Sequence, residues 1–215
     1  MLREYGLKAT FYISPDNREF TRGDLLTSHQ ITDMADYFEI GAHTMTHRSL
    51  PTISRTEAEA EIVESKMVLE RITGRPVNTF CYPRGAYTDV HAQLVKAAGY
   101  RYARTVARYK FGVVNPYKAG TSLHIYNHSS AVELCRTAKF AKFRPLAAWR
   151  YLDWSALGRA MFDHVLEQGG IFHVWGHSWE IDRNDDWRTL EDFFHYISAH
   201  PKVRYATNGE LGAYL

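Results

Sequence analysis

The sequence predicts an α/β protein with a mostly parallel sheet of about seven strands, and closure into a barrel is favoured over an open sheet. Short runs rich in aromatic and β-branched residues alternate with helical patterns along the chain. Strand, helix, strand at this rhythm is typical of βαβ units, whose strands run parallel. A length of 215 residues is enough for one sizeable core, so we expect a single domain over residues 1–215.

The expected strands are bounded by Gly, Pro, Asn or charged residues. They lie at 9–13, 39–43, 78–83, 100–106, 121–127, 170–176 and 203–207. In barrels of this kind the chemistry sits at the C-terminal ends of the strands. Residues that directly follow a strand are therefore the first candidates for a functional site.

Helices are expected between the strands. Ser54 and Glu57 predict a capping box, and Gly74 followed by Pro76 predicts the end of that helix. Further helices are expected at 88–99, 153–169 and 189–199. The stretch from Phe140 to Trp154, rich in Arg, Pro and Trp, is expected to be irregular.

Composition excludes several classes of protein. Charged residues make up 23% of the chain and the net charge is +2, which gives no nucleic-acid footprint. No apolar run approaches the roughly 18 residues of a transmembrane helix. The N-terminal "MLREYGLKAT" lacks the apolar core of a signal peptide, and the compartment is left open. Cys81 and Cys135 are too few for a thiolate metal cage.

His43 and His47 are the first candidate metal ligands. They follow the strand "EIGAH" and stand four residues apart, so both imidazoles can reach one ion if they lie on one helical turn. Zinc suits imidazole, and a catalytic zinc keeps one position open for water. The alternative is two solvated loop histidines.

His177 is the candidate general acid or base. It comes just after the strand in "FHVWGHSWEID", and a histidine titrates near neutral pH. For His173, inside the strand, we favour a packing role. A third segment, "CYPRGAY", turns at Gly85, where backbone N–H groups could face a developing oxyanion. Arg84 in that turn is a candidate to bind an acidic group, or is a solvated turn residue.

Five segments together resemble the polysaccharide deacetylase family, which shares the chitooligosaccharide deacetylase homology domain. These are "YGLKATFYI", "FEIGAHTMTH", "FCYPRGAYTD", "FHVWGHSWE" and "YATNGEL". The resemblance implies a distorted (β/α) barrel, a divalent metal, commonly zinc, and hydrolysis of an N-acetyl amide on a sugar. It implies that His43 and His47 bind the metal, that His177 protonates the leaving amine, and that the turn at Pro83, Arg84 and Gly85 helps to hold the oxyanion.

The family's first motif, a Thr-Phe-Asp-Asp-Gly run that supplies the base and the third metal ligand, has no counterpart. The first Asp-Asp pair of the chain is Asp185-Asp186, in another context. The family's usual arginine of the third motif is replaced by Cys81, and the Asp-and-Trp fourth motif is not identifiable. We therefore expect that the barrel lacks its first strand and that this chain hydrolyses its substrate weakly or not at all.

Three explanations stand: a chain that lacks its natural start, an inactive relative that binds carbohydrate, or a substitute carboxylate, for which Asp16 is the nearest candidate. A structural or partner-binding domain is a further alternative. The aromatic residues Tyr82, Tyr87, Trp175 and Trp179 would stack on sugar rings or pack the rim.

Overall fold

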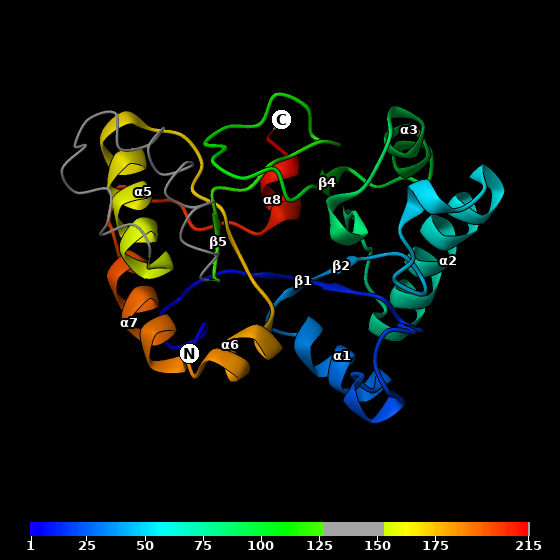
Figure 1. Ribbon diagram of the computed structural model, residues 1–215, viewed down its shortest axis with the longest axis horizontal. Coiled ribbons are helices and arrows are strands. Elements are labelled where there is room, and N and C mark those ends of the chain that lie inside the picture. Colours follow the sequence, from blue (N-terminus) through cyan, green and yellow to red (C-terminus); the bar gives the residue numbers. More distant parts are fainter. Residues whose placement is uncertain (127–152, 215) are drawn as a thin grey trace. The chain divides into compact units, whose positions relative to one another are not determined.

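Four parallel strands form the larger sheet of the protein, seen in a computed structural model that describes residues 1–126 and 153–214 (Figure 1). Their order in the sheet is their order in the chain. They are β1 (Thr10–Ile13), β2 (Glu39–Ala42), β3 (Thr79–Cys81) and β4 (Tyr102–Arg104). In the register, Ala42 lies opposite both Ile13 and Phe80, so β1, β2 and β3 end at the same edge.

Each step along this sheet passes through a helix. The connecting helices are α1 (Ser28–Ala35), α2 (Arg55–Thr73) and α3 (Asp89–Ala97). The helix α2 begins and ends as predicted. Its capping box joins Ser54 and Glu57, and Gly74 adopts the left-handed conformation at φ 64° that ends the helix.

The core of this unit is formed by the strands together with α1, α2 and α3. Apolar side chains from the strands and helices are completely or almost completely buried there, including Leu50, Ile62, Leu69, Val77, Phe80, Tyr82, Val95 and Tyr100. Gly41 in β2 is required by the packing, because a Cβ at this position would lie 2.5 Å from Cε1 of Tyr12. The strand ends are therefore held by a close-packed interior.

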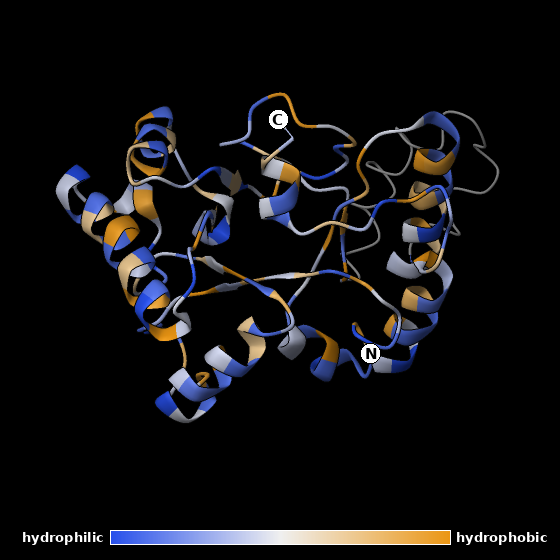
Figure 2. Ribbon diagram, turned by 180° about the vertical axis from the view of Figure 1, so that it is seen from behind, coloured by the Kyte–Doolittle hydropathy of each residue, from blue (hydrophilic) through white to orange (hydrophobic). Residues whose placement is uncertain are grey.

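A second sheet contains two short parallel strands, β5 (Leu123–His124) and β6 (Val174–Trp175). The helices α5 (Trp154–Gln168), α6 (Ser178–Asn184) and α7 (Trp187–Ile197) accompany it. Asp153 caps α5, as predicted, by accepting a hydrogen bond from the Ala156 N–H at 2.8 Å. The helices carry both hydrophobic and hydrophilic residues (Figure 2), as expected of helices with one buried side.

The chain divides into two compact units. The four-stranded unit comprises Lys8–Ala107, Val113–Gly120 and Arg204–Leu215, and it includes the short helix α8 (Asn208–Gly212). The two-stranded unit comprises Met1–Leu7, Arg108–Gly112 and Thr121–Val203. The single domain over 1–215 stays a prediction.

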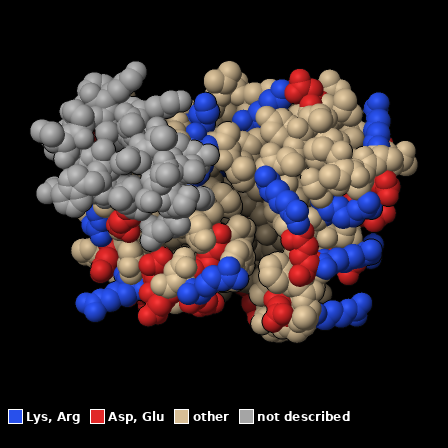
Figure 3. Space-filling model, viewed as in Figure 1, with Lys and Arg blue, Asp and Glu red and all other residues tan. Residues whose placement is uncertain are grey.

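The α/β class and the parallel pairing are confirmed, whereas a closed barrel is not shown. The strand predicted at 203–207 is wrong: Val203 donates its N–H to His200 in a turn, and Thr207 caps α8 instead. Most of the predicted irregular stretch from Phe140 to Trp154 lies outside the described residues. No helix among the described residues could span a membrane, and basic and acidic side chains are interspersed on the face drawn in Figure 3.

Candidate functional site

His43 directly follows β2 at the edge where the strands of the larger sheet end. Its N–H continues the ladder by donating to the Ile13 carbonyl at 3.1 Å. Its ring nitrogen Nδ1 lies 2.6 Å from the carbonyl oxygen of Cys81, the last residue of β3. A carbonyl oxygen only accepts, so Nδ1 carries the proton and Nε2 of His43 keeps its lone pair.

The loop from His43 to His47 is tightly turned. Thr44 is completely buried yet has φ 62°, and His47 has φ 66°. A left-handed conformation is rare for a β-branched residue and costs about 1–3 kcal/mol. Glu61 of α2 holds the loop, because its carboxylate accepts from the Thr46 N–H at 2.8 Å and from the Thr46 hydroxyl at 2.5 Å. The loop is thus anchored between its two histidines.

His47 faces a carboxylate that the sequence analysis did not select. Its Nδ1 lies 2.9 Å from Oε2 of Glu19, although the angle falls outside hydrogen-bond geometry. The other oxygen of Glu19 accepts from Arg84 at 2.5 Å. Burial by itself would raise the pKa of Glu19, but the Arg84 and His47 contacts outweigh it and hold that pKa below its ordinary value. Glu19 is therefore ionised at neutral pH.

The two imidazoles fit one metal ion in their donor chemistry. Their ring centroids are 4.8 Å apart. An unprotonated Nδ1 of His47 would be repelled by the Glu19 carboxylate, so the proton sits on Nδ1 and Nε2 is the nitrogen that can bind a metal. Metal-binding histidines are commonly oriented in this way by a carbonyl or a carboxylate on the second nitrogen.

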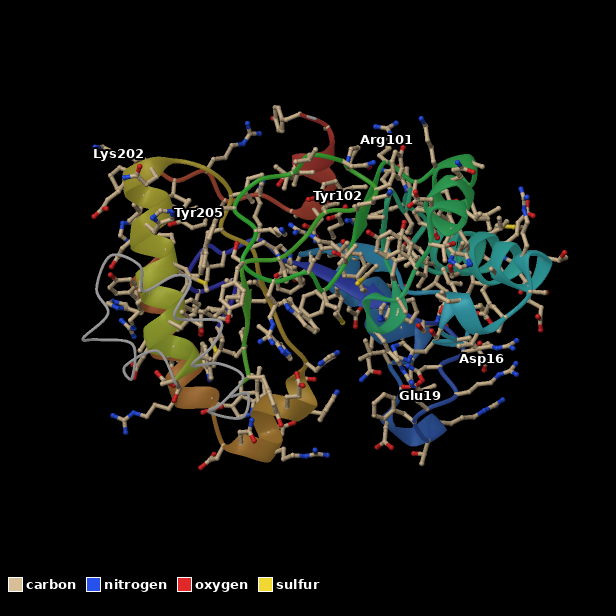
Figure 4. The ribbon with its side chains drawn as sticks, turned by 45° about the horizontal axis from the view of Figure 1, so that its top comes forward. Asp16, Glu19, Arg101, Tyr102, Lys202 and Tyr205 are labelled. Atoms are coloured by element: carbon tan, nitrogen blue, oxygen red, sulfur yellow. The ribbon has the colours of Figure 1, made fainter. Side chains whose placement is uncertain are left out.

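A third ligand for this pair is not found among the described residues, where the three-residue group of potential ligands lies elsewhere. The sequence analysis named Asp16 as the nearest substitute. Asp16 instead pairs with Arg18 at 3.1 Å, while Glu19 on the same loop reaches His47; Figure 4 labels both acidic residues. The structure therefore favours Glu19 over Asp16 as the carboxylate associated with the histidines.

The turn after β3 uses its backbone differently from the expectation. The N–H groups of Gly85 and Ala86 donate to Tyr82 and Pro83 at 2.8 and 3.1 Å, so they are engaged within the turn. Arg84 adopts φ 57° and its side chain binds an acidic group, Glu19. Arg84 therefore contacts an acidic group, as one of its two alternatives expected, and the part of this turn in holding an oxyanion stays a prediction.

A buried arginine also lies beside this edge. Arg104 of β4 is 3% exposed and pairs with Cys81 in the sheet register. Its guanidinium donates to the Asn208 side chain at 2.9 Å and to the Gly120 carbonyl, and the described residues give it no ion pair. Burial lowers the pKa of Arg104. The sequence does not indicate that Arg104 is buried here, because a single arginine in a strand of aromatic and β-branched residues forms no recognisable motif.

A hollow of about 730 Å³ opens in the loop between β1 and α1. Its lining includes Asp16, Asn17, Arg18, Phe20, Arg22 and Leu26. The Phe20 ring is 47% exposed. This loop lies against the histidine loop. The N–H groups of Asp16 and Arg18 donate to the carbonyls of Met45 and Thr46 at 2.9 and 3.4 Å.

In the two-stranded unit, His177 lies at the N-terminus of α6 and contacts Glu180 of its first turn. Nδ1 of His177 is 2.7 Å from Oε2 of Glu180, and Nε2 of His124 is 3.0 Å from the same oxygen. Burial would raise the pKa of Glu180, but the bonds to both histidines overcome it and lower that pKa to about 2. His124 and Glu180 are buried, whereas the His177 side chain is 45% exposed.

These three residues could hold a cation, since their ligand atoms lie within 4.8 Å of one another. The short contacts equally describe two N–H groups donating to one ionised carboxylate, which leaves Nε2 of His177 available. The Glu180 position was readable in principle, because His-Ser-Trp-Glu has capping-box spacing. The partner His124 was not, because its contact depends on the pairing of β5 with β6.

The remaining aromatic and histidine candidates divide between packing and exposure. His173 bonds to the Thr121 hydroxyl through Nδ1 at 2.8 Å, which agrees with the packing role expected of it. Tyr82 is completely buried and stacks on Tyr87 with centroids 4.6 Å apart. Trp175 stacks on His124 with ring centroids 3.9 Å apart. Trp179 is 41% exposed and is the member of the predicted set open to a ligand.

In the four-stranded unit His47 and Arg84 thus both contact Glu19, and the His43 ring lies 4.8 Å from that of His47 between centroids. In the other unit His177 contacts Glu180. The convergence of His177 with the histidine pair over one cavity stays a prediction.

Comparison with known proteins gives a family match over the N-terminal half. Residues 1–103 match the family described as polysaccharide deacetylase. The candidate polysaccharide deacetylase YxkH of Bacillus subtilis is 24% identical over 102 residues, which span 47% of this chain and 36% of YxkH. The matched part is therefore about a third of that relative's length.

Solved structures resemble the fold. A structure described as a candidate polysaccharide deacetylase from Mycobacterium smegmatis aligns with a TM-score of 0.72 and 17% identity, over 99% of this chain and 73% of that one. The Streptococcus pyogenes deacetylase PplD, solved with acetate, aligns with a TM-score of 0.51 and 22% identity, over 56% of this chain and 54% of PplD. Residues 1–103, which contain β1, β2, β3 and the histidine loop, are thus the part of the chain that is similar to the polysaccharide deacetylase family.

Proposed function

We propose that the protein hydrolyses an N-acetyl amide on a carbohydrate and depends on a divalent metal, commonly zinc in this family. The observation that supports this best is the state of the two histidines after β2. Nδ1 of His43 contacts the Cys81 carbonyl oxygen at 2.6 Å, and Nδ1 of His47 lies 2.9 Å from the Glu19 carboxylate. With the proton on Nδ1 of each ring, the Nε2 atoms are the nitrogens that would bind one ion.

His43 and His47 would hold the metal. When bound, such an ion polarises the acetyl carbonyl and lowers the pKa of a water ligand, which supplies the nucleophile. Water adds to the carbonyl carbon, the C–N bond breaks, and acetate and a free amine are formed. The protein's own part is to orient the imidazoles through fixed neighbours and to place the sugar.

His177 would protonate the leaving amine. Glu180 accepts from its Nδ1 at 2.7 Å, so a proton on Nε2 can be given to the substrate nitrogen while the ring stays oriented. The His177 side chain is 45% exposed, which allows it to contact a polymeric substrate.

The hollow beside the histidine loop supports a carbohydrate substrate. It presents an exposed aromatic ring, Phe20, together with the amide of Asn17 and the guanidinium of Arg22. Aromatic faces and planar polar groups are the common means of holding sugar rings and their hydroxyls. An N-acetylated sugar or oligosaccharide is therefore the proposed substrate.

A second candidate function is carbohydrate binding without turnover. It is favoured by one observation: in the part of the chain that the structure describes, no carboxylate completes a three-ligand group with His43 and His47. Two imidazoles alone should hold zinc weakly, and loss of a positioned base lowers the rate by about 10²- to 10⁴-fold.

Deacetylation of short N-acetylglucosamine oligomers, followed as acetate release with and without added zinc, tests the proposal. We expect slow turnover that requires zinc and is lost in His43→Ala and His177→Ala. Calorimetric titration with the same oligomers separates the alternatives. Binding that is independent of zinc, with no acetate released, would support the non-catalytic function.

A further inference from the structure

We propose that Glu19 is a positioning residue for His47 and that Arg84 holds Glu19 in place. The inference rests on the proposed metal site at His43 and His47, and it assigns a role to two side chains that do not themselves bind the ion. In this arrangement His47 would bind the metal, Glu19 would orient His47, and Arg84 would hold Glu19.

The two oxygens of Glu19 serve different partners. Oε2 lies 2.9 Å from Nδ1 of His47, and Oε1 accepts from Nη2 of Arg84 at 2.5 Å. The His47 side chain is 15% exposed and that of Glu19 38%, so the carboxylate closes the space behind a mostly buried imidazole. The Glu19 N–H donates to the Asn17 side chain at 2.8 Å, which fixes the backbone from which Glu19 projects.

Electrostatics explain why this carboxylate controls the ring. A glutamate side chain is ordinarily ionised at neutral pH, and the Arg84 guanidinium that donates to Glu19 favours its negative charge. A negative oxygen at 2.9 Å favours the tautomer with the proton on Nδ1 and a lone pair on Nε2. It also raises the electron density of the imidazole and so strengthens it as a ligand.

The two histidines differ in what orients them. The Nδ1 of His43 is held by the Cys81 backbone carbonyl, which no substitution at position 81 removes. His47 depends on a side chain and can therefore be altered by mutation. Arg84 is placed for its part by a strained turn, at φ 57°, beside Gly85 at φ 68°, where a Cβ would lie 2.3 Å from Val106.

The competing explanation is an ordinary surface ion pair between Glu19 and Arg84, since the Arg84 side chain is 66% exposed. Such pairs contribute little to stability. A merely structural pair would leave the tautomer of His47 unchanged when removed. The tautomer therefore separates the two explanations.

The first measurement is made on the metal-free protein by NMR of the ring nitrogens, with His47 assigned through His47→Ala. We expect the proton of His47 on Nδ1 in the wild type and a shift toward the Nε2–H form in Glu19→Ala. Glu19→Gln keeps an acceptor oxygen and should retain much of the wild-type tautomer. Asp24→Ala is the matched control, because Asp24 is a carboxylate of the same loop that bonds to Thr21.

The second measurement is zinc affinity by calorimetry. Substituting a residue that orients a metal-binding histidine typically weakens metal binding by about 10- to 100-fold. We expect a loss in this range for Glu19→Ala, a smaller loss for Arg84→Ala and none for Asp24→Ala. A His47 tautomer and a zinc affinity in Glu19→Ala equal to those of Asp24→Ala would overturn the inference. Zinc binding that is unaffected by His43→Ala would instead overturn the proposed metal site, and the tautomer would still decide the role of Glu19.

Discussion

Replacing Glu61 with alanine tests whether α2 anchors the histidine loop. Glu61 and Thr46 are 8% and 7% exposed, and the carboxylate accepts two bonds from Thr46, one from its N–H and one from its hydroxyl. The substitution removes the acceptor from both donors at once. The Thr46 N–H is then buried without its partner unless water enters.

The expected loss of stability follows from those two bonds. Hydrogen bonds to a charged group contribute about 1.5–3 kcal/mol each, and an unsatisfied buried donor costs about 1–3 kcal/mol. Because the two bonds share one carboxylate, they do not add fully, and we expect a decrease of about 2–4 kcal/mol in the free energy of unfolding. Glu64→Ala is the matched control, since Glu64 is an exposed residue of the same helix and reports the change in helix propensity alone.

Urea unfolding of the wild type, Glu61→Ala and Glu64→Ala gives the comparison directly. Zinc titration of the same proteins shows whether the loop, once released, still presents both histidines. If Glu61→Ala unfolds at the same urea concentration as Glu64→Ala, the anchoring argument is refuted, because the two bonds would then contribute nothing beyond solvent contacts.

Three further predictions follow from the same contacts. The pKa of Glu180 is about 2 in the folded protein, against 4.5 ordinarily. The ionised carboxylate therefore stabilises the fold above pH 4.5, and this effect is lost as the pH falls toward 2. The difference in unfolding free energy between wild type and Glu180→Gln should shrink over that interval. Gly85→Ala should destabilise the protein more than Gly74→Ala by about 1–3 kcal/mol in urea unfolding, because both have φ near 65° but only Gly85 faces a close neighbour. Burial raises the pKa of the Cys81 thiol to about 12, with Arg104 opposing it in part, so mass spectrometry should show alkylation of Cys81 at pH 8 on the order of 10³-fold slower than for free cysteine; a rate like that of free cysteine would contradict this assignment.

The ends of the elements were predictable because they depend on neighbours in the sequence. The capping box at Ser54 and the left-handed Gly74 act within one helical turn, and both are present. The cap at Asp153 follows the same rule. The strand predicted at 203–207 is wrong: its residue types favour a β-strand, but its backbone pairs with no neighbouring strand, and Thr207 caps α8 instead.

The sequence by itself determined that two histidines follow one strand and that a third follows another, since residue type and strand ends are local properties. Only the tertiary structure decided which acid faces each ring: Glu19 for His47 and Glu180 for His177. Glu19 reaches His47 through a loop that bonds to the next strand's loop, and Glu180 is shared with His124 because β5 pairs with β6. Such contacts depend on sheet register and side-chain direction across distant segments, which no local pattern encodes.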